Sequence, residues 1–151
     1  MADNIEIDEH QIQRIFSYIE EELPKDISRR IFTQLGYECF IRFQSWINGI
    51  GQNIEKLMED VNIKRLSPHW EKLEYGKDEN EIILTGRKVD RCACPIASEN
   101  QKSKSLCNYC CKTFQEEMFS IFTGKKVDVI ITESKLLGGN RCSTKIIISN
   151  D

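Results

Sequence analysis

The sequence of 151 residues has no long apolar run, no basic cluster and no stretch typical of an export leader. Its longest apolar stretches, such as Ile146 to Ile148, are far shorter than the roughly 20 residues that a membrane-spanning helix needs. The first residues, Met1 to Glu9, are acidic and polar and lack the basic and apolar regions of a secretory signal. We therefore expect no bilayer span and a reducing, cytoplasmic location.

Acidic side chains slightly outnumber basic ones, 24 against 21. The formal net charge is −3 and the isoelectric point is about 5.5. Nucleic-acid-binding proteins carry a concentrated positive field, so we do not expect a nucleic-acid partner. There are three prolines, and we find no internal repeat. These features predict a single ligand-binding-type domain over 1–151.

Helical periodicity dominates residues 8–60. Apolar side chains recur at the three- and four-residue spacing of amphipathic helices, and Pro24 and the glycines mark breaks. Gly36 is interpreted as one such break. The predicted helices are Asp8 to Leu23, Ile27 to Leu35, Glu38 to Gly49 and Asn53 to Asp60.

Residues 69–149 show a different pattern, in which β-rich segments flank a cysteine-rich loop and one helix. Gly124 is expected to end that helix. The predicted elements are strands His69 to Tyr75 and Glu81 to Val89, the loop Asp90 to Gln101, a helix from Ser103 or Ser105 through Phe122, and strands Val127 to Ser134 and Arg141 to Ser149. The predicted fold class is α+β, with N-terminal helices packed against an antiparallel sheet of two hairpins and one long Cys-bearing helix.

Cysteine is the residue type whose distribution indicates chemistry. One of the seven, Cys39, stands among aromatic residues and is interpreted as a core side chain. The other six fall within 51 residues: Cys92, Cys94, Cys107, Cys110, Cys111 and Cys142. In a reducing compartment such clustering indicates metal or thiol chemistry more often than disulfides.

The spacing of these cysteines favours a structural zinc site. Cys92 and Cys94 project to the same side of an extended segment, and Cys107 and Cys110 share a helix face, so both pairs can converge on one ion. The start of a helix also lowers the pKa of nearby thiols, which favours the metal-binding thiolate. The candidate metal ligands are Cys92, Cys94, Cys107, Cys110 and Cys142, four of which would complete a tetrahedral site.

Three alternatives remain open at this stage. The cysteines can pack as small apolar side chains with no metal, they can hold an iron-sulfur cluster, or they can form a redox-active dithiol. A thiol left over by a metal would be a candidate reactive cysteine.

Other candidate residues carry weaker signals. His10 and His69 have no motif around them and are interpreted as surface or packing histidines. An aromatic group is interpreted mainly as core, although it would also suit an apolar pocket: Tyr37, Phe40, Phe43, Trp46 and Trp70. The charged faces of the first helices are compatible with a homodimer.

The C-terminal third resembles the 4-vinyl-reductase-like domain, a small-molecule-binding module that shares its broad fold with haem nitric-oxide sensors and Bet3-type trafficking subunits. The resemblance rests on a Cys-bearing helix ending in Phe122-Thr123-Gly124, the strand Val127 to Ser134, and Gly138-Gly139-Asn140-Arg141-Cys142, which is similar to the family's Gly-Asp-x-x-Cys turn. The Cys-x-Cys-Pro segment is most similar to stand-alone Cys-rich relatives from bacteria and archaea.

Sensors of this family bind a zinc ion through four ligands. The resemblance matches two of these ligand positions to the neighbourhood of Cys107 and to Cys142, and the other two to Ile131 and Ser134. These two side chains do not replace the family's ligands, and Cys92, Cys94 and Cys110 are the candidate replacements.

The final strand and its glycine turn also resemble hydrolases that open L-2-amino-thiazoline-4-carboxylate. The sequence thus predicts a cytoplasmic, zinc-binding sensory domain that holds a small apolar or aromatic ligand between its helical half and its sheet. The alternative is a thiol-dependent hydrolase or a redox or iron-sulfur protein.

Overall fold

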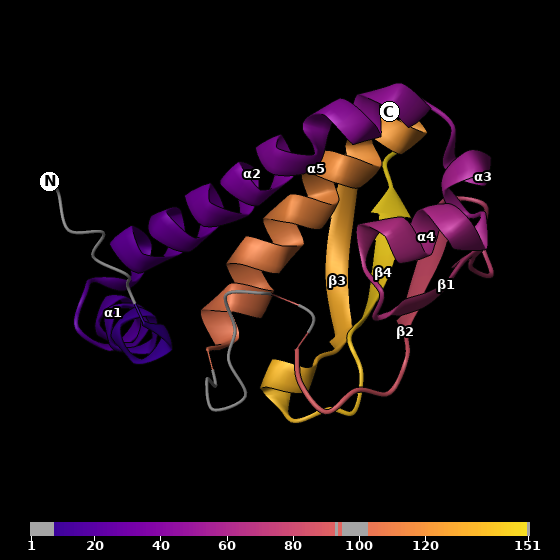
Figure 1. Ribbon diagram of the computed structural model, residues 1–151. Coiled ribbons are helices and arrows are strands. Elements are labelled where there is room, and N and C mark those ends of the chain that lie inside the picture. The colour runs from indigo at the N-terminus through magenta and orange to yellow at the C-terminus, as the bar shows by residue number, and fades with distance from the viewer. Residues whose placement is uncertain (1–7, 93, 95–102, 151) are drawn as a thin grey trace, which may run out of the picture.

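A computed structural model describes residues 8–92, 94 and 103–150. It confirms the predicted α+β class (Figure 1). The helices are α1 (Glu9–Glu21), α2 (Lys25–Ile50), α3 (Ile54–Leu57), α4 (Asp60–Leu66), the π-helix η1 (Leu106–Cys111), α5 (Lys112–Thr123) and the 3₁₀-helix η2 (Lys135–Leu137). The strands are β1 (Trp70–Tyr75), β2 (Glu81–Gly86), β3 (Val127–Glu133) and β4 (Ser143–Ile148).

The four strands form one antiparallel sheet in the order β1-β2-β4-β3. The two predicted hairpins, β1–β2 and β3–β4, are therefore joined edge to edge through β2 and β4. In this join Leu84 is paired with Thr144, and Thr144 is paired with Ile131 of β3 on its other side. The join brings the cysteine-rich loop that follows β2 next to the start of β4.

Helices cover one face of the sheet. Inward-facing side chains such as Ile82, Val129 and Ile146 are buried, whereas the neighbouring Ile130 points to the other face and is 43% exposed. Figure 1 shows α2 and α5 running side by side, with α4 beside β1, and α2 contacts α5 while α5 contacts β3 and α4 contacts β1. The main hydrophobic core lies between these helices and the sheet, and includes Ile47, Leu57, Ile63, Leu84, Met118, Phe119 and Phe122.

The first helix was predicted within two residues at each end. Asp8 is the N-cap: its Oδ1 accepts from the Gln11 backbone N–H at 2.7 Å, and the Gln11 Oε1 accepts from the Asp8 N–H at 2.9 Å. This capping box satisfies two of the backbone donors that a helix start leaves unpaired. The helix ends before Pro24, as expected.

The predicted break at Gly36 is wrong, because α2 is one continuous helix of 26 residues. Gly36 lies in its interior and is buried against η1. A Cβ atom at Gly36 would lie 2.2 Å from the carbonyl oxygen of Cys110, closer than any real contact. The glycine is there for close packing between two helices, and the resulting burial offsets its low helix propensity.

The predicted helix Asn53 to Asp60 is also corrected. It is the four-residue α3, capped by Asn53, whose Oδ1 accepts from the Lys56 N–H at 2.9 Å. A separate helix, α4, begins at Asp60 and was not predicted. The Asn62 side chain donates to the Lys56 carbonyl oxygen at 2.7 Å and so fixes the turn between the two helices.

The Cys-bearing helix begins at residue 104, as predicted, but its first turns contain the π-helical stretch η1 where we expected α-helix throughout. In η1 the Lys112 N–H donates to the carbonyl of Cys107, five residues back. Such widened turns recur at functional sites. The helix then continues as α5 and ends at Gly124, which has φ 68° in the left-handed region and confirms the predicted stop.

Two strands are shorter than predicted, since β2 ends at Gly86 and β4 begins at Ser143. Of the predicted loop Asp90 to Gln101, residues 93 and 95–101 lie outside the described residues. None of the described helices is both long and apolar enough to span a bilayer.

Candidate functional site

A cavity of about 200 Å³ lies between α2, the Cys-bearing helix and one end of the sheet. All seven cysteines of the chain line it. The rest of its wall is mainly apolar, with a few polar groups: Arg42, Phe43, Leu66, Ser67, Trp70, Leu84, Leu106, Phe114, Gln115, Ile131, Glu133, Ser134, Leu136, Ser143 and Thr144.

The end of β2 positions two of the thiols. Gly86 lies so close to the chain before β4 that a Cβ there would be 2.3 Å from the Cys142 carbonyl oxygen. Past this contact the Val89 N–H donates to the Asn140 carbonyl at 3.0 Å, so the two segments run side by side. This pairing brings Cys92 to Cys142, and the two thiols share a hydrogen bond.

Two further thiols complete a group of four. The Cys94 N–H donates to the Cys92 Sγ at 3.5 Å. The Cys107 thiol, in η1, interacts electrostatically with both Cys142 and Cys94. Cys111 also interacts electrostatically with Cys94, Cys107 and Cys142, but its sulfur accepts a hydrogen bond from Gln115. We call Cys92, Cys94, Cys107 and Cys142 the thiol quartet. Its members come from three separate segments of the chain.

Cys110 has a different partner. It is buried in η1, and its thiol shares a hydrogen bond with Cys39 of α2. The interpretation of Cys39 as an isolated core residue is therefore wrong: Cys39 is half-buried and lines the cavity. The local sequence around Cys39 is apolar and gave no sign of this, since the pairing depends on how α2 packs against η1.

Cys111 belongs to a buried polar network at the base of the cavity. The Gln115 Nε2 donates to the Cys111 Sγ at 3.2 Å, and the Thr144 hydroxyl donates to the Gln115 Oε1 at 2.7 Å. Gln115 and Thr144 are 2% and 3% exposed, so these bonds replace ones that water would otherwise make. The network links α5 to β4.

Five of the cavity thiols have raised pKa values. Burial raises the pKa of Cys39, Cys107 and Cys110 above the ordinary value, and it raises the pKa of Cys111 to about 12. The pKa of Cys92 is raised first by its hydrogen bond with Cys142 and then by burial.

The expectation that a helix start lowers the pKa of Cys107, Cys110 and Cys111 is therefore wrong. Loss of water around the thiols outweighs the helix dipole. Nucleophilic thiol chemistry requires the thiolate, so burial lowers the reactivity of these thiols in the metal-free protein.

All five predicted metal ligands line the cavity, and the structure divides them. Cys92, Cys94, Cys107 and Cys142 form the thiol quartet, while Cys110 faces Cys39. Within the described residues, no three Cys, His, Asp or Glu side chains stand in the arrangement of a metal site. Closing the quartet around an ion would thus require the thiols to rotate.

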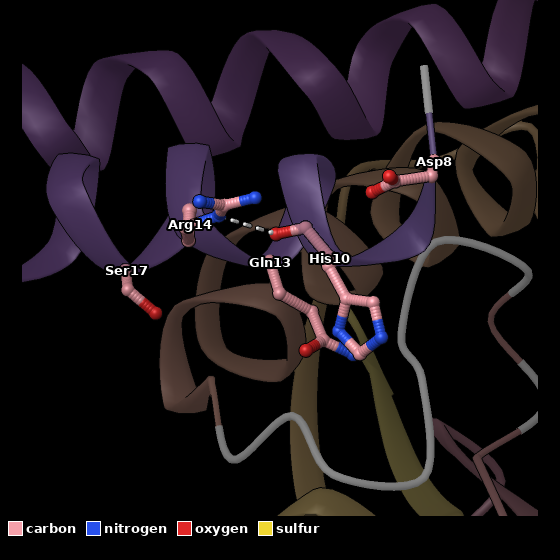
Figure 2. A pocket seen from close by; sticks show the side chains of 5 residues that line it. All are labelled: Asp8, His10, Gln13, Arg14 and Ser17. Atoms are coloured by element: carbon pink, nitrogen blue, oxygen red, sulfur yellow. Dashed lines mark hydrogen bonds between the residues drawn. The ribbon is translucent and has the colours of Figure 1, made fainter. Parts of the chain in front are cut away.

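The histidines lie elsewhere among the described residues. His10 is exposed on α1, where it lines a shallow polar hollow with Asp8, Gln13, Arg14 and Ser17 (Figure 2). The Arg14 Nε donates to the His10 backbone carbonyl at 3.4 Å (Figure 2), and His10 is not among the residues that line the cavity. His69 is half-buried and lies outside the residues that line the cavity.

The aromatic group is split between core and cavity. Phe40 is buried in the main core, and Trp46 packs against that core. Phe43 and Trp70 contact the core and also line the cavity, while Tyr37 is 41% exposed. The core role is thus correct for every member of the group except Tyr37, and Phe43 and Trp70 line the cavity as well.

The sequence matches no family model and no curated protein sequence. Its fold is similar to a solved structure of trafficking protein particle complex subunit 3 from Naegleria fowleri, which is covalently bound to palmitic acid. The TM-score is 0.45 and the identity 12%, over 92% of this chain and 82% of that one.

Proposed function

We propose that this protein is a small-molecule-binding or sensory domain whose cavity carries a structural zinc site formed by Cys92, Cys94, Cys107 and Cys142. The observation that carries the proposal is the thiol quartet itself. Four thiols from three chain segments interact pairwise: Cys92 with Cys142 and Cys94, and Cys107 with Cys142 and Cys94. Tetrahedral zinc takes four thiolates in closed structural sites.

The resemblance to the 4-vinyl-reductase-like domain supports the same site. The positions where that family has its zinc ligands fall near Cys107 and on Ile131, Ser134 and Cys142, and these residues all line the cavity. Ile131 and Ser134 provide no thiol, so Cys92 and Cys94 from the loop after β2 take the two remaining places in our proposal.

The zinc would stabilise the folded chain. It would tie the loop after β2, η1 and the start of β4 together, and its binding energy would add to the free energy of folding. Because the thiols are protonated in the metal-free cavity, zinc binding would also release protons.

Metal content of the purified chain tests this proposal, measured by plasma mass spectrometry together with an anaerobic absorption spectrum. We expect one zinc per chain and no visible absorption. Cys107→Ser and Cys142→Ser should lose the metal, and the matched control Cys39→Ser should keep it. Iron with visible bands would replace this proposal by an iron-sulfur protein, and equal metal content in all variants would overturn the quartet.

The ligand would occupy the apolar part of the cavity, beside the quartet. Phe43, Leu66, Trp70, Phe114 and Ile131 line this part, and Gln115 and Thr144 add polar atoms. A volume of about 200 Å³ suits a single aromatic ring better than a long chain.

Fluorine NMR with fluorophenol as the probe tests the ligand part of the proposal. We expect a saturable shift of the probe signal. Ile131→Phe, which fills the cavity, should abolish the shift. Ile130→Phe, on the opposite face of the same strand, should leave it unchanged. A shift that survives in Ile131→Phe would place the probe outside the cavity.

A further inference from the structure

Cys39 and Cys110 form a pair outside the thiol quartet, and both interact electrostatically with Cys94 of the quartet. The two residues are far apart in the sequence, on α2 and η1, and their thiols share a hydrogen bond. Cys110 is 3% exposed, whereas Cys39 is half-buried at the cavity wall next to the exposed Arg42. One thiol of the pair is thus accessible from the cavity, and the other is enclosed.

The backbones around this pair are unusually close. At Gly36 the two helices approach so tightly that a Cβ would lie 2.2 Å from the Cys110 carbonyl oxygen and 3.0 Å from its carbon. Cys39 follows Gly36 by three residues and lies on the same side of α2. A disulfide needs Cα atoms within about 4.4–6.8 Å, a separation that only closely packed segments reach. Gly36 provides such packing at Cys110.

We propose that Cys39 and Cys110 form a reversible disulfide when a hydroperoxide enters the cavity. The inference is independent of the zinc proposal, since neither residue belongs to the thiol quartet. Cys39 is not a ligand in the proposed zinc site, and this inference gives it a redox role.

The hydrogen bond decides the order of the steps. Burial is the largest influence on Cys39 and raises its pKa, while the hydrogen bond from Cys110 and the charge of Arg42 lower it. Every influence on Cys110 raises its pKa, so Cys39 is the thiol of the pair that loses its proton more readily. The Cys39 thiolate attacks the outer peroxide oxygen and becomes a sulfenic acid, while the alcohol leaves with the proton that Cys39 gave up. The Cys110 thiol then attacks the Cys39 sulfur and expels water. Together two thiols and one hydroperoxide give one disulfide, one alcohol and one water.

The bond would fasten α2 to η1. These two elements form opposite parts of the cavity wall, with Phe43 on one and Cys107 on the other. In the reduced protein they are held by noncovalent contacts, among them the Cys39–Cys110 hydrogen bond and the Arg29 guanidinium over the Tyr109 ring, and in the oxidised protein they would be joined covalently. Peroxide would therefore lock the cavity in its packed form.

Peptide mapping of the full chain tests the inference. The protein is treated with hydrogen peroxide, its remaining thiols are blocked with iodoacetamide, and it is digested with trypsin. We expect the peptide Ile31–Arg42 to be joined to Ser105–Lys112, with fragment ions that place the bond on Cys110 and not on Cys107 or Cys111. A reducing agent should release both peptides.

Two variants complete the test. Cys39→Ser should lose the cross-link, whereas Cys111→Ser should keep it. The unfolding temperature should rise on oxidation in the parent and in Cys111→Ser but not in Cys39→Ser. Recovery of Ile31–Arg42 fully alkylated after peroxide, or joined to another cysteine, would overturn the inference. If Cys39→Ser has the same zinc content as the parent protein, loss of the cross-link in this variant does not come from loss of the metal site.

Discussion

The Sγ of Cys107 lies 2.8 Å from the Oγ of Ser134, and both side chains are buried. This contact joins η1 to the end of β3. The Ser134 hydroxyl favours the Cys107 thiolate and lowers the pKa that burial raises. It is therefore placed to orient the sulfur that we propose as a zinc ligand, without being a strong ligand itself.

Changes at Ser134 should alter zinc affinity in both directions. Ser134→Ala removes the hydrogen bond to Cys107, and loss of such an outer partner weakens metal binding by about 10–100-fold. Ser134→Cys should instead strengthen binding, because it places a thiol where the resemblance implies a ligand. Competition with a chromogenic chelator measures both effects, with the exposed Ser45→Ala as the control. Equal affinities for Ser134→Ala and the parent protein would contradict the proposed site.

Two glycines of α2 should respond to alanine with opposite sign. Gly36→Ala forces a Cβ into the Cys110 carbonyl, and such overpacking costs about 1–3 kcal/mol. Gly49→Ala meets nothing within 4 Å and should stabilise the protein by about 0.5–1 kcal/mol, because glycine is disfavoured in a helix. Urea unfolding measures both free energies. Destabilisation of equal size at both positions would show that the contact of Gly36 with η1 is unimportant.

Loss of the Thr144 hydroxyl should destabilise the base of the cavity. Thr144→Val keeps the shape of the side chain but leaves the buried Gln115 Oε1 without its donor, at a cost of about 1–3 kcal/mol. Thr144→Ser keeps the hydroxyl and should retain the hydrogen bond. We therefore expect Thr144→Val to have a lower unfolding temperature than the parent protein, despite the apolar character of valine. A Thr144→Val protein as stable as the parent would mean that another donor reaches Gln115.

The stability of the metal-free protein should fall as the pH rises above about 9. Cys111 has its pKa raised from 9.0 to about 12 in the folded chain, so above pH 9 the unfolded chain loses this proton while the folded chain keeps it. The contribution of Cys111 is thus complete below pH 9 and is lost progressively between pH 9 and 12.

Urea unfolding of the parent and of Cys111→Ser at pH 7 and pH 10, both with chelator, isolates this contribution. We expect the parent to lose more stability than the variant over this interval. Identical losses would indicate that the Cys111 thiol titrates normally in the fold.

The element pattern was predictable where local chemistry decides it. Asp8 with Gln11 and Gly124 in its left-handed conformation are cap signals that act within one helical turn, and both marked real helix ends. The alternation of apolar residues likewise located the four strands. Gly36 was misread because the same residue type serves a turn or a close helix contact, and only the position of η1 distinguishes them.

The sequence by itself determined that the site is rich in cysteine and that six of the seven cysteines lie in the second half of the chain. It also indicated which of them share a face, because residue spacing along a strand or helix decides this. Tertiary structure alone decided which thiols meet. Cys92 reaches Cys142 because Gly86 lets the end of β2 lie against the start of β4, and Cys39 reaches Cys110 because Gly36 lets α2 lie against η1. Both pairings depend on close backbone contacts between distant segments, and no local pattern records such contacts.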